Sequence, residues 1–153
     1  MAWSAPGFWF RPPGRLARAL APLGAFYAAA TARRVARPPR HRPRAPVICL
    51  GNLVAGGAGK TPAAMLVLER LAARGVAVHA ISRGYGSAAA EGPPRRVDPR
   101  RDRAVAVGDE PLLLAPWAPV WVGRDRAESA AAAEAAGAEA LVLDDGFQDP
   151  ALA

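Results

Sequence analysis

The sequence predicts an α/β domain with a mostly parallel sheet flanked by helices, preceded by a basic N-terminal segment. The first observation is a set of short apolar runs typical of buried strands, at residues 47–50, 76–81, 120–122 and 140–143. The second is that segments with helical character separate these runs, so the strands are expected to pair in parallel. A chain of 153 residues is long enough for one such domain with its own core.

Helices are predicted between these strands at residues 60–74, 110–115 and 125–136. Gly75 and Gly137 are expected to end two of them, because glycine readily adopts the left-handed conformation found at helix termini. Residues 82–103 are expected to form a long polar loop, and residues 104–107 a brief strand. Cys49 is the single cysteine, which excludes an internal disulfide, and it is expected to be a small buried side chain.

The N-terminal 46 residues differ sharply in charge from the rest of the chain. They contain nine arginines and no acidic residue, whereas residues 47–153 carry a charge of −2. A basic arm of this kind is expected to bind phosphate groups, on an anionic membrane or on nucleic acid. We therefore divide the chain into residues 1–46, a basic helix followed by a Pro/Arg-rich linker, and residues 47–153, the α/β domain.

Within the arm, residues 15–37 are predicted to form an amphipathic helix that Pro22 and Gly24 bend or interrupt. Its uncharged stretch, residues 19–32, has 14 residues, fewer than the roughly 20 needed to span a bilayer. We favour a helix that lies in the membrane interface, with its arginines on anionic lipid. The alternatives are the apolar region of a signal peptide and an N-terminal helix packed on the rest of the fold.

Residues 51–62 carry the strongest functional signal, a glycine-rich segment that follows a strand and opens a helix. A phosphate-binding loop needs this context, because glycines let backbone N–H groups turn toward phosphate oxygens and the helix N-terminus adds partial positive charge. Val54 stands where the usual loop has its first glycine, and the neighbouring glycines are expected to supply the flexibility. The predicted nucleotide-binding residues are Gly56, Gly57, Ala58, Gly59, Lys60 and Thr61.

Lys60 is the one lysine among twenty basic residues, which indicates a position where a compact ammonium group is required. We expect Lys60 to reach the outer phosphates of ATP and the Thr61 hydroxyl to bind Mg²⁺. The apolar strand that ends in Asp144 and Asp145 is how P-loop proteins place an acid beside this metal. Asp144 is expected to be the principal ligand, directly or through water, and Asp145 the second. The glycine-rich loop and the two acidic residues together predict a P-loop NTPase-like fold and a protein that uses ATP and Mg²⁺.

Two further motifs leave alternatives open. Asp109 is either the base that accepts a proton from an attacking hydroxyl group or the cap of the following helix. Arg83 and Tyr85 follow the second strand and either bind a phosphorylated substrate or lie on a surface turn. His41 and His79 lack the spacing of metal ligands.

Taken in order, these motifs resemble those of the tetraacyldisaccharide 4'-kinase family of lipid A biosynthesis. The resemblance extends over essentially the whole chain and rests on Gly51-Asn52, residues 56–62, 82–86, 108–111 and 144–148, and on Pro6-Gly7-Phe8-Trp9. It implies an ATP-dependent kinase that phosphorylates the 4'-hydroxyl of tetraacyldisaccharide 1-phosphate. The place implied is the cytoplasmic face of the bacterial inner membrane, with the protein peripheral or N-terminally anchored.

The resemblance also implies roles for individual residues. Lys60 and Thr61 fall in its nucleotide site, Asp144 and Asp145 in its acidic metal-site motif, and Asp109 at its proposed acid/base position. The family's chains are longer than this one, so the resemblance implies a truncated chain that lacks further strands and much of the lipid-binding surface.

The expected partners are the acylated disaccharide lipid and an anionic membrane surface, with no nucleic acid and no protein partner. Three alternatives remain. A metallochaperone-like GTPase would need an Asn-Lys-x-Asp motif, and the one lysine already lies in the phosphate loop. A nucleic-acid ATPase would use the basic arm to grip phosphate, and binding would weaken steeply with salt. A catalytically inactive fragment would bind without reaction.

Overall fold

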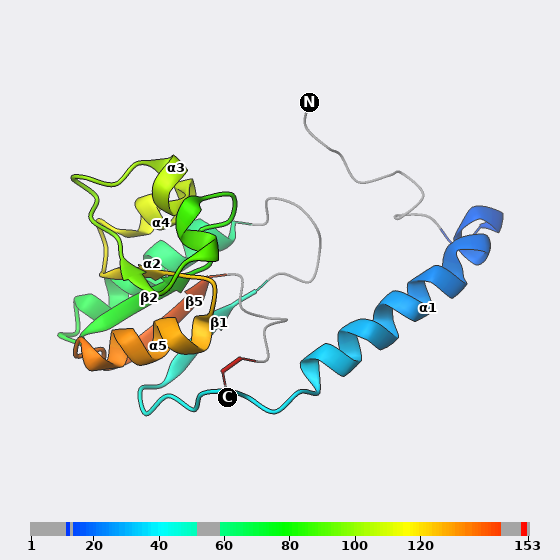
Figure 1. The fold of residues 1–153 in the computed structure, drawn as a ribbon, viewed down its shortest axis with the longest axis horizontal. Helices are drawn as coiled ribbons and strands as arrows, with labels where there is room; N and C mark the ends of the chain where they lie inside the picture. The colour runs from blue at the N-terminus through cyan, green and yellow to red at the C-terminus, as the bar shows by residue number, and fades with distance from the viewer. Residues whose placement is uncertain (1–11, 13, 52–58, 145–150, 153) are drawn as a thin grey trace.

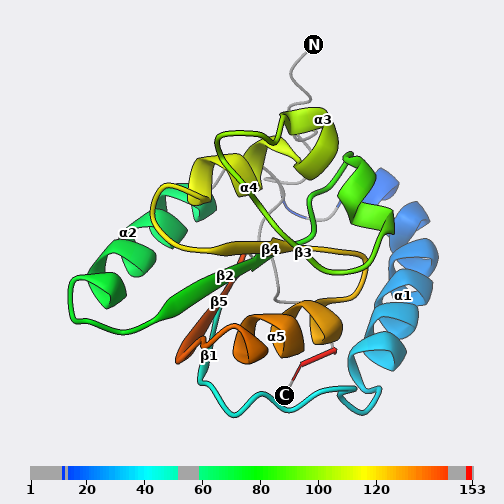
Figure 2. The same cartoon turned by 60° about the vertical axis from the view of Figure 1, so that its left-hand side comes forward.

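In the computed structural model, the described residues are 12, 14–51, 59–144 and 151–152. They form a five-stranded sheet in the order β1-β5-β2-β4-β3 (Figure 1 and Figure 2). The strands are β1 (Val47–Leu50), β2 (Val78–Ser82), β3 (Arg95–Arg96), β4 (Val120–Val122) and β5 (Ala140–Asp144). The helices are α1 (Arg15–Val35), α2 (Lys60–Ala72), α3 (Ala104–Val107), α4 (Asp109–Leu114) and α5 (Arg126–Ala135), with a 3₁₀ turn η2 (Ala88–Glu91).

The pairing confirms the predicted parallel sheet. Strands β1, β5, β2 and β4 are all parallel, and only the two-residue β3 runs antiparallel, beside β4. The connection from β1 through α2 to β2 passes over β5, which enters the sheet last between them. Neighbouring strands of such a sheet therefore come from distant parts of the sequence, and their carboxyl ends meet at one edge.

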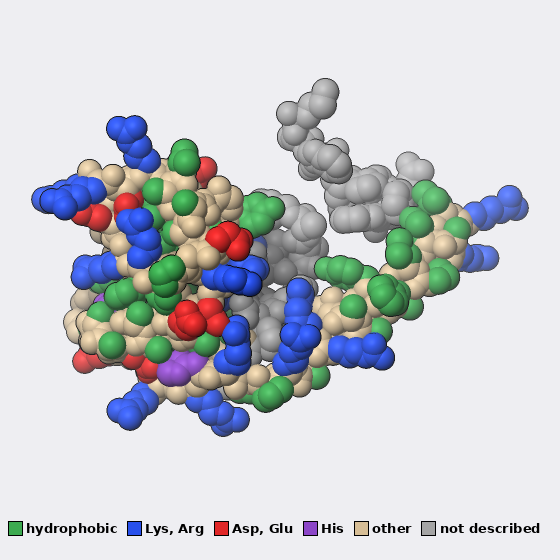
Figure 3. All heavy atoms as spheres, viewed as in Figure 1, with side chains coloured by type: hydrophobic (Ala, Val, Ile, Leu, Met, Phe, Trp, Pro, Cys, Tyr) green, Lys and Arg blue, Asp and Glu red, His purple; other side chains and the backbone are tan. Residues whose placement is uncertain are grey.

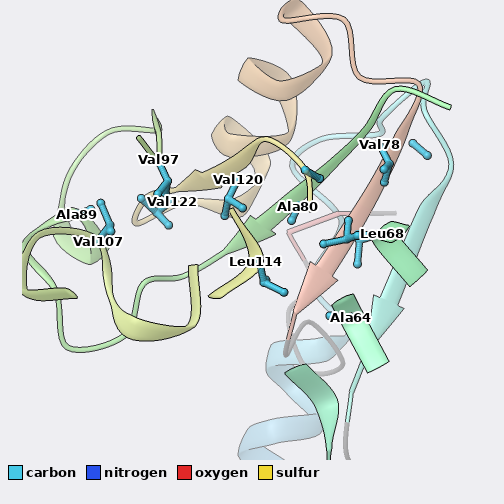
Figure 4. Close-up of a cluster of buried hydrophobic side chains, with 13 residues drawn as sticks. Ala64, Leu68, Val78, Ala80, Ala89, Val97, Val107, Leu114, Val120 and Val122 are labelled. Carbon is cyan, nitrogen blue, oxygen red and sulfur yellow. The ribbon is translucent and has the colours of Figure 1, made fainter. Parts of the chain in front are cut away.

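Helices cover both faces of this sheet (Figure 2). On one face, Ala64 and Leu68 of α2 and Leu114 of α4 are fully buried against the strands, where they join the cluster drawn in Figure 4. On the other face, α5 packs Ala130 and Ala133 on the alternate strand residues. The small alanine side chains let α5 approach the sheet closely, and burial on both faces is what apolar parallel strands require.

The structure corrects three expectations about local structure. Residues 104–107 form the helix α3, not a strand, because the Arg103 carbonyl accepts hydrogen bonds from the N–H groups of Ala106 and Val107. The position beside β4 belongs instead to β3, inside the segment expected to be only a loop. Cys49 is exposed rather than buried. Cys49 lies on β1, which is an edge strand of the described sheet. It stays exposed because α5 packs over β2 and β4 rather than over this edge.

The N-terminal helix α1 runs through Pro22 and Gly24 without interruption, so of the two expected outcomes, a bend or an interruption, the interruption is absent. One proline removes a single hydrogen bond from a helix of 21 residues. No residue of α1 is buried, and Leu23, Phe26 and Tyr27 are each about two-thirds or more exposed. Figure 1 shows α1 extending away from the sheet. None of the described helices is long and apolar enough to cross a membrane.

His79 joins β2 to β4 through its ring. The Trp121 indole Nε1–H donates to His79 Nδ1 at 3.2 Å, and the two rings stack with centroids 6.5 Å apart. Burial, and secondarily the positive charge of Arg96, lowers the pKa of His79 below its ordinary value of 6.5. The folded protein therefore favours the neutral imidazole of His79, whose unprotonated Nδ1 accepts the hydrogen bond from Trp121.

We expect this histidine to make the fold sensitive to mild acid. Below pH 6.5 the unfolded chain takes up a proton that folded His79 resists, so the free energy of unfolding falls as the pH drops through this value. Urea unfolding at about pH 7 and about pH 5.5 measures the effect, above the range in which most carboxylates titrate. His79→Phe keeps an aromatic ring and should reduce the difference between the two values. An unchanged difference in this variant would contradict the assignment.

Candidate functional site

The carboxyl ends of β1 and β5 lie side by side. Leu50, which precedes the glycine-rich loop, pairs in register with Asp144, the last residue of β5. The Asp144 side chain is almost completely buried. The start of the glycine-rich loop and the end of the acid-tipped strand therefore lie side by side. Gly56, Gly57 and Ala58 of the loop, and Asp145, lie outside the described residues.

The far end of the loop opens α2 at Lys60. Gly59 caps this helix with a φ of 73°, a left-handed conformation that favours glycine. Thr61, the second residue of α2, donates its hydroxyl hydrogen to Glu110 Oε1 at 3.0 Å. The predicted metal-binding hydroxyl is therefore held by a carboxylate from α4.

Glu110 is a site residue that the sequence analysis missed. It is half-buried and lines the cleft at this edge of the sheet, whereas the neighbouring Asp109 is exposed. The two acids open α4, and successive helical residues point in different directions, so only one of them faces Thr61. The signal for Glu110 in the sequence was its place in a pair of adjacent acidic residues, Asp109 and Glu110. Asp144 and Asp145 form a second pair of this kind.

Oxygen atoms of Thr61, Glu110 and Asp144 are the hard ligands that Mg²⁺ prefers, and magnesium sites commonly use one or two carboxylates together with substrate phosphates. The donor set therefore fits this ion. Among the described residues, no group of three or more His, Cys, Asp or Glu side chains is placed to hold a metal ion, so phosphate or water oxygens would have to complete such a site.

Two glycines in close contact shape the opposite side of the site. A Cβ on Gly84 would lie 2.7 Å from the Val107 carbonyl oxygen, and one on Gly108 would lie 3.1 Å from the Gly84 Cα. Both have positive φ, of 62° and 94°. The loop after β2 thus packs directly on the junction of α3 and α4. This contact places Arg83 and Tyr85, both exposed, beside the start of α4.

A cleft of about 710 Å³ lies at this edge of the sheet. It is lined by Arg34, Arg37, Pro38, Arg40, Ser82, Arg83, Gly84, Tyr85, Glu110, Arg124, Arg126, Asp144 and Ala151. Six arginines face two carboxylates, so the cleft combines an anion-binding surface with an acidic edge suited to a metal ion. Figure 3 shows basic and acidic side chains gathered where the α/β domain meets α1. Arg83, Tyr85 and Asp144 are thus brought together, while Asp109 is not among the lining residues.

Two of these arginines are fixed by the protein itself. Arg40 forms an ion pair of 2.6 Å with Asp125, the residue that also caps α5 by accepting from the Ala127 N–H. Arg126 is buried, and its Nη2 donates to the Asp144 backbone carbonyl at 3.4 Å. The N-terminus of α5 is therefore attached both to the linker and to the acid-tipped strand.

Glu134 holds the same linker near the other end of α5. Its Oε1 accepts from the backbone N–H groups of Arg44 and Ala45 at 2.6 and 3.0 Å, and its Oε2 lies 2.8 Å from His41 Nε2. Burial alone would raise the pKa of Glu134, but these donors outweigh burial and hold the pKa below 4.5. The linker, expected to be merely extended, is thus bound along α5.

Comparison with known proteins gives consistent results. The family model described as LpxK, Tetraacyldisaccharide-1-P 4'-kinase, matches residues 16–153. The chain is 66% identical over 151 residues to the tetraacyldisaccharide 4'-kinase of Dinoroseobacter shibae, covering 97% of the chain and 44% of that protein. It is 57% identical over 149 residues to the protein of the same name from Jannaschia sp., covering 97% of the chain and 45% of that protein.

The fold also matches a solved structure. The crystal structure of "apo" form LpxK from Aquifex aeolicus in complex with ATP aligns with a TM-score of 0.74 and 28% sequence identity. The alignment covers 89% of this chain and 46% of that one. The chain therefore spans a little under half the length of the relatives that it matches.

The close contact at Gly84 leads to a prediction about stability. Gly84→Ala and Gly86→Ala each place a side chain at positive φ, at a cost of about 1–2 kcal/mol. Only Gly84→Ala also forces a Cβ against a backbone carbonyl, which should add about 1–3 kcal/mol. Urea unfolding of both variants compares the two costs, and equal losses of stability would show that this contact is not tight.

Proposed function

We propose a function for this chain from the family to which it belongs, the tetraacyldisaccharide-1-P 4'-kinases. The chain forms the nucleotide-binding part of an ATP-dependent kinase that phosphorylates the 4'-hydroxyl of tetraacyldisaccharide 1-phosphate in lipid A biosynthesis. The observation that carries this proposal is the pairing of β1 with β5, which brings Asp144 beside the strand that leads into the glycine-rich loop.

The residues divide the chemistry between them. Backbone N–H groups of residues 56–61 bind the ATP phosphates, and Lys60 neutralises charge on the outer ones. Thr61, Asp144, Asp145 and Glu110 hold Mg²⁺, directly or through water. When bound, this ion supplies further neutralisation of the β- and γ-phosphate oxygens. Catalysis then depends mainly on position and charge, because phosphoryl transfer asks for little covalent chemistry from the protein.

Asp109 is the base in this proposal. It accepts the proton of the attacking 4'-hydroxyl group as the bond from that oxygen to the γ-phosphorus forms and the bond to the β-phosphate oxygen breaks. Its exposed position at the start of α4, next to Glu110, is compatible with access to a substrate that arrives from outside the domain. Arg83 and Tyr85 bind this substrate from the loop after β2.

The N-terminal part, residues 1–46, binds the anionic cytoplasmic face of the bacterial inner membrane, and residues 47–153 bind nucleotide. What supports this division is the exposed apolar surface of α1 together with the arginines near its ends. Each arginine at the interface adds about 1 kcal/mol of attraction to anionic lipid. The proposal includes neither nucleic acid nor a protein partner.

The central chemical assignment can be tested in a hybrid protein in which this chain replaces the matching 44% of the Dinoroseobacter shibae relative. Lys60→Ala should lower kcat/KM by at least about 100-fold, as removal of a group that stabilises transition-state charge does. Arg70→Ala removes a positive charge from the last turn of the same helix and should leave the rate nearly unchanged. Equal rates for Lys60→Ala and the unmodified hybrid would refute the proposed nucleotide site.

The membrane assignment is tested by co-sedimentation of the chain with vesicles. Phe26→Asp places a charge at a side chain that is 73% exposed on α1 and should reduce binding to vesicles rich in phosphatidylglycerol about tenfold or more. Val105→Asp alters an exposed apolar side chain of α3 and serves as the matched control. Retention on DNA without retention on these vesicles would favour the nucleic-acid alternative.

A further inference from the structure

Parts of the chain that are distant in sequence supply arginines to the same cleft. Arg34 lies in the last turn of α1, Arg37 follows that helix, Arg83 follows β2 and Arg124 follows β4, and all four line the same space. A helix that served only as a membrane anchor would have no reason to extend its basic end into the cleft. The arrangement therefore calls for a role inside the site.

The chemistry of these side chains points to a phosphate group. Within the part of the chain that the structure describes, Arg37, Arg83 and Arg124 form no ion pair, whereas Arg40 pairs with Asp125. The planar guanidinium group donates two parallel hydrogen bonds to phosphate oxygens, and several such groups around one cleft can surround a phosphate monoester.

Two phosphate sources are chemically equivalent here, ATP and the phosphorylated acceptor, and the placement of α1 favours the acceptor. The nucleotide phosphates belong with Lys60 and Thr61 at the start of α2 in the proposed function. The arginines at the end of α1 continue instead from a helix whose exposed apolar side chains include Leu23 and Phe26. A lipid whose acyl chains lie beside this helix brings its phosphorylated sugar to the cleft.

We propose that Arg34 and Arg37 complete, with Arg83 and Arg124, a subsite for the 1-phosphate of the acceptor lipid. The helix α1 is then part of the substrate site as well as a membrane contact. This inference rests on the proposed kinase function, since it assigns one end of that enzyme's second substrate. The acceptor's phosphate binds there without reacting, so the subsite acts on affinity and orientation rather than on bond-breaking.

The linker contacts explain how an otherwise exposed helix can hold its arginines in place. Only Pro38 and Pro39 separate Arg37 from Arg40, and proline fixes the backbone angle φ, so this step is stiff. Arg40 is paired with Asp125, and the Arg40 and His41 N–H groups both donate to the Ala151 carbonyl at 3.1 Å. Glu134 then fixes the following residues. We assign Glu134 as a positioning residue for the subsite.

The hybrid kinase described above allows a direct test with two acceptors, one carrying the 1-phosphate and one lacking it. Arg34→Gln/Arg37→Gln should raise the KM for the phosphorylated acceptor about tenfold or more, the loss expected for charged hydrogen bonds to phosphate. The KM for ATP should stay within about twofold, and the KM for the acceptor without phosphate should rise clearly less than the KM for the phosphorylated acceptor, only as far as weaker membrane binding requires. A rise in the KM for ATP instead would assign these arginines to the nucleotide and overturn the inference.

The control removes the same charge from the other end of α1. Arg15→Gln/Arg18→Gln should weaken vesicle binding as much as Arg34→Gln/Arg37→Gln does, because both remove two positive charges from the membrane-facing segment. It should leave the preference for the phosphorylated acceptor intact. If both double variants lose this preference equally, the arginines act only through general attraction to the membrane, and the subsite does not exist.

Failure of the subsite is distinguishable from failure of the proposed kinase. Binding of glucosamine 1-phosphate to the chain itself, measured by calorimetry, does not depend on catalysis and should weaken in Arg34→Gln/Arg37→Gln. An unmodified hybrid that lacks kinase activity, with this binding preserved, would refute the function and leave the phosphate site standing. An active hybrid in which Arg34→Gln/Arg37→Gln behaves as the unmodified protein would refute the subsite alone.

The positioning role has its own signature. Glu134→Gln should raise the KM for the phosphorylated acceptor by several-fold with the KM for ATP unchanged, because it loosens the linker and not the sheet. Glu128→Gln changes an exposed carboxylate on the same helix and should have no effect. The assignment would be contradicted if Glu134→Gln lowered the stability of the protein and raised the KM values for ATP and for the acceptor to the same degree. Glu134 would then have a merely structural role.

Discussion

The hydrogen bonding of β1 to β5 is the constraint on which the rest of the site depends. A parallel ladder fixes which residues end side by side, and in this sheet it sets Asp144 next to Leu50. A shift of one residue would turn the buried carboxylate toward the opposite face of the sheet, because side chains alternate along a strand. The apolar residues of β5, buried on both faces, therefore hold the acid in place as well as stabilising the core.

Helix α5 connects this constraint to the N-terminal segment. Its alanine-rich face packs on β2 and β4, while its polar residues Asp125 and Glu134 hold the linker that follows α1. At the other rim, the contact between Gly84 and Gly108 seats the loop after β2 on the start of α4. The cleft thus has a rigid floor made of strand ends and a wall supplied by a segment attached from outside the sheet.

Local patterns were sufficient for much of this architecture. Apolar runs located the parallel strands, and the glycine-rich segment before Lys60 located the start of α2, because both signals depend on adjacent residues. The missing parts depend on contacts between distant residues. Arg95–Arg96 is a strand only because β4 offers it an edge, and Glu110 matters because α4 faces Thr61. The attachment of the linker to α5 could not be predicted from local patterns, because Glu134 lies 93 residues from its partner His41.

The exposure of Cys49 gives the molecule a natural attachment point for a spectroscopic label. This thiol is the only one in the sequence, and it lies on β1 two residues before Gly51, where the strand leads into the glycine-rich loop. A fluorophore or spin label placed there would sit close to the start of the glycine-rich loop without any substitution elsewhere in the chain. Changes in this loop can thus be followed by spectroscopy on the chain with its sequence unaltered.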